Sequence, residues 1–446
     1  MTRRLRIALL LAAALPAFTA AGELARRPYA GIAVGPSPDG ANIAVSGVVP
    51  DGPSAKSGIQ VGDIIIEVDN DLIETPQDFT KTVRSLDAGA AYPAKIRRGG
   101  EELEIQWTFG ALPYESYEGR ETVYTSVESP TGTHRSILVK PAGDGPFPVV
   151  FFIQGLSCAT VEAPMGGDNP YARFVDQITG LGYAVYRVEK SGIGDSVGTP
   201  CEEIGFEQEL AGYRAGYEQL RAMDGVDPQR IYLMGHSMGG FFAPRLAAEV
   251  PVAGVAAYGT GMQNWVEYVI RINRDQSALA GAARADVEDA VRLAVRFQTL
   301  LCVDKLTIPE ILERHPEIEE YVRGNSPDGR TMYSRSAEFF HELYDQEMAR
   351  VWAQVEAPVA AMWGEADFVS YRDEHEAIAA VVNEARPGNG TFLMVPGADH
   401  GFRAASSFRQ SMEQSMALPF SEDVVRSLVA WIEGLGKQDA AASRPR

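Results

Sequence analysis

The chain has 446 residues, of which 45% are hydrophobic and 22% are charged. These proportions are ordinary for globular proteins and exclude collagen-like, low-complexity and disordered chains, while the length indicates two or three domains. The 40 Lys and Arg residues against 60 Asp and Glu residues give a net charge of -20, which is the wrong sign for tracking a phosphate backbone or an anionic bilayer. We therefore expect no nucleic-acid partner.

Residues 1–21 have the pattern of a secretory signal peptide. Three arginines among the first six residues precede an apolar run at 7–15 and small residues at 19–21. The run is too short to span a bilayer, and no other apolar stretch approaches about 18 residues. We expect a periplasmic or secreted protein without a membrane span; an uncleaved signal that acts as a membrane anchor is the alternative.

Residues 28–110 form a unit whose pattern predicts β-structure. Short apolar runs are separated by clusters of Gly, Pro and Asp, which is typical of strands joined by turns. At about 80 residues the unit can hold its own core. The pattern predicts strands at 31–34, 43–49, 64–68, 94–97 and 102–107, and one helix at 76–86.

Two sequences in this unit carry a family resemblance. The run Tyr29-Ala30-Gly31-Ile32 fits a carboxylate-binding loop, and residues 53–65 fit the signature S-P-A-x-x-A-G-L-x-x-G-D-x-I. The unit therefore resembles a PDZ domain of the bacterial protease type. The resemblance implies that a protein C-terminus binds as an added strand, with backbone N–H groups beside Gly31 holding its carboxylate. A PDZ domain that serves only as a packed spacer is the alternative.

From residue 120 onward, strands alternate with long helices, which predicts a mostly parallel α/β sheet covered on both faces. Residues 262–355 break this alternation with mostly helical sequence, which predicts an inserted cap. The last six strands are near-continuous apolar runs, as expected for strands buried on both faces. The predicted strands are 123–128, 136–140, 148–153, 183–188, 230–235, 252–258, 359–363 and 391–395.

The sequence Gly235-His236-Ser237-Met238-Gly239 follows one of these strands and opens a helix. A G-x-S-x-G sequence in this context is typical of a nucleophilic serine on a strained turn, where the helix N-terminus favours developing negative charge. Gly235 and Gly239 leave room for the neighbouring strand and helix. We predict Ser237 as the nucleophile.

A serine hydroxyl needs a base, and the base needs an acid that fixes its tautomer. His400 lies just beyond the last strand, at the carboxyl edge of the sheet, where the functional sites of open α/β sheets lie. Asp367 follows the preceding strand, and Glu365 is the alternative orienting acid. The order Ser237, Asp367, His400 matches a known order of triad residues.

An oxyanion needs two preorganised N–H donors. Met238, the residue after the predicted nucleophile, supplies one, and Leu156 in the loop after the strand at 148–153 is expected to supply the other. An ordinary strand-ending turn at Gly155 is the alternative interpretation of that loop.

Residues 120–437 resemble an α/β-hydrolase with a helical cap, similar to the esterase and prolyl oligopeptidase branches of that superfamily. The chain departs from it in having Gln154-Gly155 where most relatives have His-Gly, and Ser191-Gly192-Ile193-Gly194-Asp195-Ser196 where many have R-G-x-G-x-S. That second departure leaves the role of the 191–196 loop open. The sheet order of the superfamily implies that Cys158 and Cys201 lie on loops after neighbouring strands and form a disulfide, with Cys302 free.

These features predict a serine hydrolase that acts on a small-molecule ester or a peptide, with ester hydrolysis first and peptidase activity second. A binding protein with a vestigial pocket is a third possibility. No Cys/His cluster with metal-ligand spacing is present in the sequence, and we expect no cofactor. In the cap, Trp265, Tyr268, Val269 and Ile272 are expected to pack, whereas Arg271 and Arg274 are either solvated or clamp an acidic substrate group.

Overall fold

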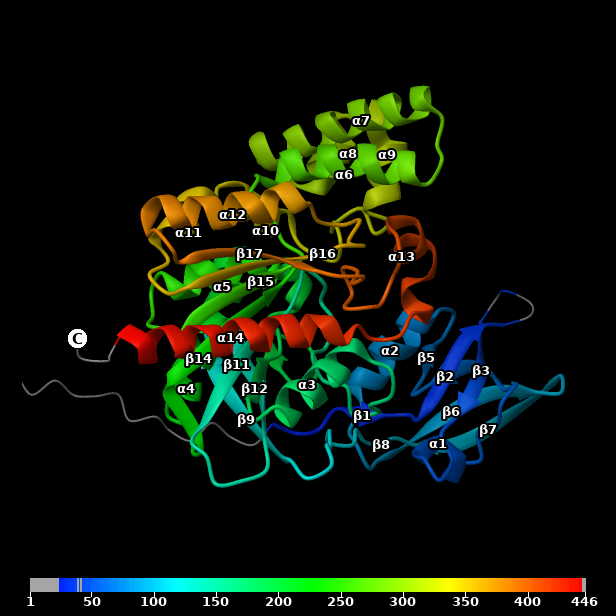
Figure 1. The fold of residues 1–446 in the computed structure, drawn as a ribbon. Helices are drawn as coiled ribbons and strands as arrows, with labels where there is room; N and C mark the ends of the chain where they lie inside the picture. Colours follow the sequence, from blue (N-terminus) through cyan, green and yellow to red (C-terminus); the bar gives the residue numbers. More distant parts are fainter. Residues whose placement is uncertain (1–23, 38–39, 41, 443–446) are drawn as a thin grey trace, which may run out of the picture.

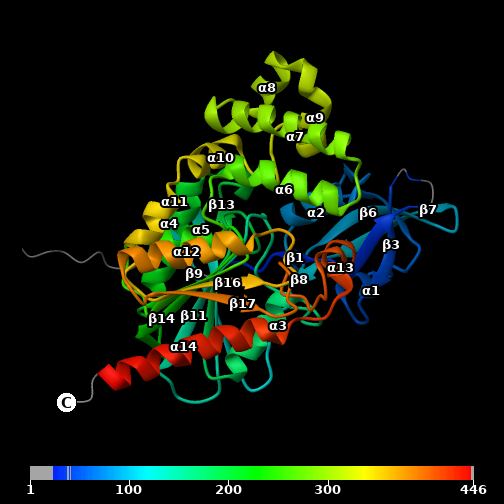
Figure 2. The ribbon, with the colours of Figure 1, turned by 45° about the horizontal axis from the view of Figure 1, so that its top comes forward.

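The computed structural model describes residues 24–37, 40 and 42–442, so the predicted signal peptide lies outside the described residues. Figures 1 and 2 show a small β-rich domain beside a larger α/β domain, with a group of helices above the edge of the large sheet. This arrangement confirms the predicted fold class, an α/β protein with a helical cap and a β-rich N-terminal domain. None of the described helices is both long and apolar enough to cross a membrane.

The N-terminal domain contains a six-stranded antiparallel sheet with the order β2-β3-β4-β6-β7, in which β5 pairs with β4. Its core includes Trp107 and Phe109, whose stacked rings have centroids 5.1 Å apart. A separate pair, β1 with β8, closes the base of the domain by aligning Tyr29 with Gly110. The elements are β1 (Pro28–Tyr29), β2 (Ile32–Pro36), β3 (Ile43–Val48), α1 (Pro53–Lys56), β4 (Ile64–Val68), β5 (Asp71–Leu72), α2 (Pro76–Ser85), β6 (Ala91–Arg98), β7 (Glu101–Thr108) and β8 (Gly110–Ala111).

The large domain is built on a nine-stranded sheet with the order β13-β10-β12-β11-β14-β15-β16-β17, in which β9 pairs with β10. The six strands from β12 to β17 in this order are parallel, and they are the six near-continuous apolar runs of the sequence. The strands are β9 (Glu121–Ser129), β10 (Gly132–Lys140), β11 (Phe147–Ile153), β12 (Ala184–Val188), β13 (Val197–Gly198), β14 (Val226–His236), β15 (Gly254–Tyr258), β16 (Val359–Gly364) and β17 (Gly390–Val395).

Helices cover both faces of this sheet, as the buried strands require. On one face α3 (Pro170–Gly180) and α14 (Glu422–Ala442) contact each other and the sheet. On the other face α4 (Phe206–Leu220), α5 (Gly239–Ala247) and α12 (Arg372–Ala385) pack against it. The cap is inserted after β15 and therefore follows the carboxyl end of a parallel strand.

The cap between β15 and β16 is helical (Figure 2). Its second helix continues directly into a π-helical turn at Thr299–Val303. A further short helix, α13 (Phe408–Gln414), follows β17. The cap helices are α6 (Trp265–Leu279), α7 (Arg284–Gln298), α8 (Ile308–Arg314), α9 (Glu319–Asn325), α10 (Ala337–Tyr344) and α11 (Met348–Gln354).

A buried guanidinium holds the segment before the N-terminal domain against the large domain. Arg26, whose side chain is 6% exposed, pairs with Glu162 at 2.7 Å and also with Asp195. The Asp195 carboxylate accepts a further bond from the N–H of Arg27 at 2.9 Å and pairs with Arg135 at 3.1 Å. Asp195 lies in the 191–196 loop that differs from the superfamily pattern, so in this chain that loop anchors the segment leading into the N-terminal domain.

Candidate active site

Ser237 lies in the sharp turn between β14 and α5. Its φ of 56° is in the left-handed region that non-glycine residues seldom adopt, and its N–H donates to the carbonyl oxygen of Tyr258 at 2.8 Å. Gly239 lets the helix approach the sheet, because a Cβ there would lie 2.1 Å from the carbonyl oxygen of Ile153. A strained strand-to-helix turn of this kind exposes the serine side chain at the carboxyl edge of the sheet.

His400 and Asp367 meet at the same edge, from the loops that follow the neighbouring strands β17 and β16. The Nδ1 atom of His400 lies 3.0 Å from Oδ2 of Asp367. Because a carboxylate can only accept, Nδ1 carries the proton in this contact, and Nε2 of the neutral ring is left as the basic nitrogen.

The Asp367 carboxylate is held from several sides. It is 1% exposed, and it accepts from the N–H groups of Val369 at 2.8 Å and Ser370 at 2.9 Å and from the Ser370 hydroxyl at 2.6 Å. Burial acts to raise the pKa of Asp367, but His400 and these hydrogen bonds outweigh it and hold that pKa below its ordinary range. The carboxylate therefore remains ionised beside the imidazole.

The other two acids of this region have different partners. Glu365, the alternative orienting acid, accepts from the N–H of Gly397 at 3.1 Å. The carboxylate of Asp399 accepts from the hydroxyls of Ser411 at 3.0 Å and Ser415 at 2.7 Å, and so orders the loop around His400. Of these three acids, Asp367 is the one in contact with the imidazole.

The predicted oxyanion residues Leu156 and Met238 line one cavity together with Ser237 and His400. Gly155 packs closely against the serine, since a Cβ at that position would lie 3.2 Å from the Cβ of Ser237. One side chain that contacts this loop, that of Lys190, was not identified from the sequence. Lys190, fully buried, donates to the carbonyl oxygen of Gly155 at 2.6 Å. Burial lowers the pKa of Lys190 to about 8, which still leaves an ammonium at neutral pH.

The cavity has a volume of about 450 Å³. Its walls carry apolar side chains, the amides of Gln263, Asn273, Gln276 and Asn325, and the rings of cap residues. None of the side chains found to line it in the described part of the chain belongs to Asp, Glu, Lys or Arg. The site therefore presents an uncharged surface around Ser237 and His400.

Three of the four cap residues that were expected to pack also line this cavity. Trp265, Tyr268 and Ile272 line it, whereas Val269 is buried in the core as predicted. Arg271 pairs with Asp373 at 2.9 Å and Arg274 pairs with Glu288, so both arginines are engaged in ion pairs with neighbouring helices.

The cysteines are arranged as the superfamily's sheet order implies. Cys158 and Cys201 form a disulfide with an S–S distance of 1.95 Å, and Cys302 is free and buried. Within the described residues, no group of three or more His, Cys, Asp or Glu side chains is arranged to hold a metal ion.

The predicted carboxylate loop of the N-terminal domain, Tyr29 to Ile32, leads into β2. Gly31 has a φ of 73°, a conformation that favours glycine. The carbonyl oxygen of Gly31 accepts from Val49 at 2.9 Å and that of Ala30 accepts from Ser54 at 3.1 Å. Among the described strands of this sheet, β2 pairs only with β3, so its outer edge is the one at which an added strand would be expected to pair.

Comparison with known families identifies both domains. The sequence profile of the family described as serine aminopeptidase, S33, matches residues 168–403, more than half of the chain, and the chain belongs to this family of hydrolases. The PDZ domain profile matches residues 28–108.

Curated relatives match over the PDZ region. A probable periplasmic serine endoprotease DegP-like of Pseudomonas putida is 41% identical over 69 residues, which are 16% of this chain and 14% of that protein. Serine endoprotease DegS of Escherichia coli is 37% identical over 71 residues, which are 16% of this chain and 20% of that protein. The chain thus spans a fifth or less of the length of these two relatives.

Solved structures similar to this chain include esterases and peptidases. Est1E from Butyrivibrio proteoclasticus has a TM-score of 0.41 and 13% identity, over 69% of this chain and 99% of that chain. The Pyrococcus horikoshii acylaminoacyl peptidase has a TM-score of 0.41 and 14% identity, over 74% of this chain and 46% of that chain. DcsB in complex with a substrate analogue has a TM-score of 0.45 and 18% identity, over 70% of this chain and 99% of that chain.

Proposed function

We propose that this member of the serine aminopeptidase S33 family is an exported serine hydrolase that cleaves carboxylic esters of uncharged acids and alcohols. One observation carries the proposal. Ser237, in its left-handed turn, and His400, which Asp367 holds, border a single cavity whose described lining residues include no Asp, Glu, Lys or Arg.

In the proposed reaction, Ser237 Oγ attacks the ester carbonyl carbon while His400 Nε2 takes the hydroxyl proton. The carbonyl oxygen becomes an oxyanion, which the N–H groups of Leu156 and Met238 stabilise. His400 then returns the proton to the leaving alkoxide, which releases the alcohol and leaves an acyl ester on Ser237. Water, activated by the same imidazole, hydrolyses that ester to the acid and restores the serine. Asp367 keeps the ring oriented and stabilises its protonated form.

Peptidase activity is the second candidate, and the family's description favours it. An aminopeptidase must bind a protonated substrate amine, and burying that charge without a carboxylate partner is costly. The uncharged lining of the cavity therefore supports an ester or an N-blocked substrate over a peptide with a free N-terminus.

The test compares matched esters and amides that carry neutral, anionic or cationic groups. We expect the highest kcat/KM on neutral esters, stoichiometric labelling by a fluorophosphonate, and loss of both in Ser237→Ala. A preference for amino-acyl amides with a free ammonium would replace the ester proposal with the aminopeptidase one. Absence of both labelling and turnover would leave the binding-protein alternative.

The proposed function includes export and recognition of a protein C-terminus by the PDZ domain. Three observations support export: the basic and apolar pattern of residues 1–15, the Cys158–Cys201 disulfide, and the periplasmic description of the DegP-like relative of the PDZ region. Fractionation of cells that produce the full-length chain tests it, since an exported protein is released with the periplasm or the medium.

A further inference from the structure

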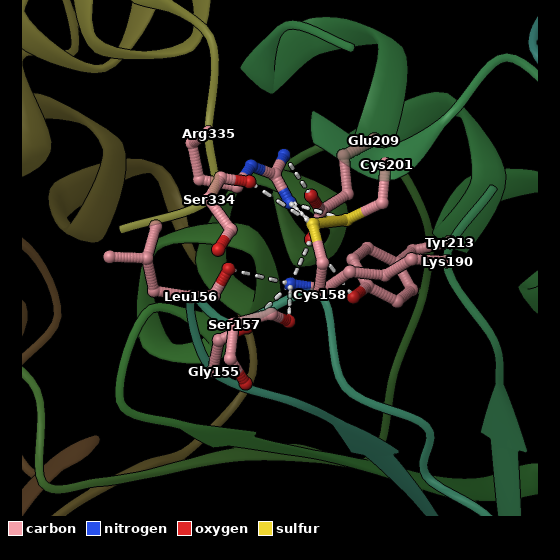
Figure 3. The surroundings of a disulfide bond; sticks show 10 residues. All are labelled: Gly155, Leu156, Ser157, Cys158, Lys190, Cys201, Glu209, Tyr213, Ser334 and Arg335. Atoms are coloured by element: carbon pink, nitrogen blue, oxygen red, sulfur yellow. Dashed lines mark hydrogen bonds and ion pairs between the residues drawn. A yellow bond between two sulfur atoms is a disulfide. The ribbon is translucent and has the colours of Figure 1, made fainter. Parts of the chain in front are cut away.

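The ammonium of Lys190 lies against the predicted oxyanion loop (Figure 3). Besides the carbonyl oxygen of Gly155, its Nζ donates to those of Leu156 at 3.2 Å and Ser157 at 3.0 Å. Three successive carbonyl groups therefore converge on one buried cation. A loop held in this way has little freedom to rotate its peptide groups.

The peptide group between Gly155 and Leu156 links this cation to the chemistry. Its oxygen accepts from Lys190 at 2.6 Å, and its nitrogen carries the predicted oxyanion N–H. Because a peptide group is planar and trans, its C=O and N–H bonds point in opposite directions. Fixing the oxygen on the inner side consequently fixes the direction of the N–H, and a cation on the oxygen also polarises the N–H.

Lys190 is itself held in place from behind. Its Nζ lies 3.1 Å from Oε1 of Glu209 on α4, and Oε2 of the same carboxylate pairs with Arg335 at 2.5 Å. The side chains of Lys190, Glu209 and Arg335 are each at most 2% exposed. The Tyr213 hydroxyl donates to Glu209 at 3.1 Å.

Arg335 brings the cap into this network. It comes from the segment before α10, stacks on the ring of Phe339 at 4.0 Å, and its Nη1 lies 3.2 Å from the sulfur of Cys201 in the disulfide. Figure 3 shows the resulting line of contacts from Arg335 through Glu209 and Lys190 to the loop. Side chains from the cap, from α4 and from the segment just after β12 thus meet at one peptide group.

We propose that Lys190, held by the Glu209–Arg335 pair, is a positioning residue that keeps the Leu156 N–H directed at the oxyanion. The proposal rests on the proposed function. Without the ammonium, the Gly155–Leu156 peptide is free to rotate and to present its carbonyl oxygen to the developing negative charge, which would oppose the reaction.

The experiment separates oxyanion binding from general stability. Lys190→Met keeps an unbranched side chain but removes the ammonium. Three quantities are measured on the full chain: kcat and KM for a neutral ester, the inhibition constant of an aryl trifluoromethyl ketone, and that of the matching alcohol. Ser237 adds to the ketone carbonyl and turns its oxygen into an oxyanion, whereas the alcohol only occupies the cavity.

We expect Lys190→Met to lose about 100-fold in kcat and in ketone affinity, with KM and alcohol affinity within about threefold of the wild type. The matched control is Arg187→Met. Arg187 is another buried cation, which pairs with Glu115 at 2.6 Å and donates to the carbonyl oxygen of Val161 at 2.7 Å. Its loss should lower the melting temperature without changing the ratio of ketone to alcohol affinity.

If Lys190→Met fails to fold, Glu209→Gln takes its place, because the amide still offers Lys190 an acceptor but weakens its anchorage. It should show the same selective loss of ketone affinity at smaller size. The positioning role is overturned if the folded variant keeps the wild-type ratio of ketone to alcohol affinity, whether both affinities are unchanged or both fall by the same factor. A wild-type protein without turnover or fluorophosphonate labelling would instead contradict the proposed function itself.

Discussion

The imidazole of His236 donates from Nε2 to the carbonyl oxygen of His400 at 2.8 Å. The residue before the predicted nucleophile therefore holds the main chain of the predicted base. The two rings lie 5.2 Å apart but titrate differently. Burial lowers the pKa of His236 to about 3. Burial also acts to lower the pKa of His400, but the charge of Asp367 and its hydrogen bond outweigh this and raise that pKa above 6.5.

This difference predicts a single acid limb in the pH profile. Because His400 accepts a proton only when neutral, kcat/KM on a neutral ester should fall as the pH drops through one pKa above 6.5. His236 and His375, with pKa values lowered by burial to about 3 and about 4, remain neutral throughout this range. Initial rates between about pH 5 and 9 measure the limb.

Asp367→Asn provides the comparison for this profile. Without the carboxylate the pKa of His400 should fall, so the limb moves to lower pH, and kcat should drop by about 10⁴-fold because the ring loses its orienting acceptor. A rate that is flat across the range, or a limb that stays in place in Asp367→Asn, would contradict the assignment of His400.

The strand order explains why much of this site was predictable. Ser237, Asp367 and His400 each follow an apolar run that reads as a buried parallel strand, and such strands end at one edge of a sheet. The carboxyl-edge positions of all three residues could therefore be inferred, together with the chain order. The contact between His400 and Asp367 rather than Glu365 depends on the path of one loop, which the pattern leaves open.

The buried network around Lys190 was not predictable in the same way. Lys190, Glu209 and Arg335 come from three separate segments, and each alone has the pattern of an ordinary surface charge. The one available signal was the position of Lys190 just after a strand that is buried on both faces. Likewise, the helical spacing of Trp265, Tyr268 and Ile272 identifies a buried face, but not that a cavity lies against it.

Reduction of the disulfide should destabilise the protein strongly. The Cys158–Cys201 bond closes a loop with a sequence separation of 43 residues, for which the chain-entropy relation gives about 4 kcal/mol of unfolding free energy. Urea denaturation with and without reductant measures the difference, and Cys302→Ser controls for thiol exchange. Burial raises the pKa of Cys302 to about 12, so iodoacetamide should modify it only after unfolding. A non-reduced digest with a Cys302-linked peptide would refute this pairing.

The Arg26 contact should contribute far more than a surface ion pair. Arg26→Ala leaves the buried Glu162 carboxylate without its cation, whereas Asp195 retains Arg135. We expect a loss of about 3 kcal/mol in the free energy of unfolding and faster proteolysis of the connection between the domains. Arg230→Ala is the control, because its pair with Asp227 is half exposed and should matter by less than about 1 kcal/mol. Equal effects of the two substitutions would mean that Arg26 does not anchor the domains.

Removal of the PDZ domain separates recruitment from catalysis. Tyr29 and Gly110 are partners across the β1–β8 pair, so deleting residues 30–109 leaves two adjacent ends that a short glycine linker can join. The anchors on either side of the deletion, Arg26 and Glu115, remain in contact with the large domain. Because the described lining of the candidate active-site cavity contains no residue from the deleted segment, turnover of a small soluble ester should stay within about twofold of the wild type.

Binding of a peptide C-terminus should disappear in the same variant. The outer edge of β2 and the loop at Gly31 are the features that would hold an added strand and its carboxylate. Fluorescence polarisation with a library of labelled peptides, each with a free or an amidated C-terminus, measures this binding on the full chain. We expect free-carboxylate peptides to bind the full chain, and their amidated versions and the deletion variant to give no binding. If amidation makes no difference, carboxylate capture is wrong and the domain acts as a spacer. If the deletion abolishes ester turnover, the domain is instead a structural part of the hydrolase.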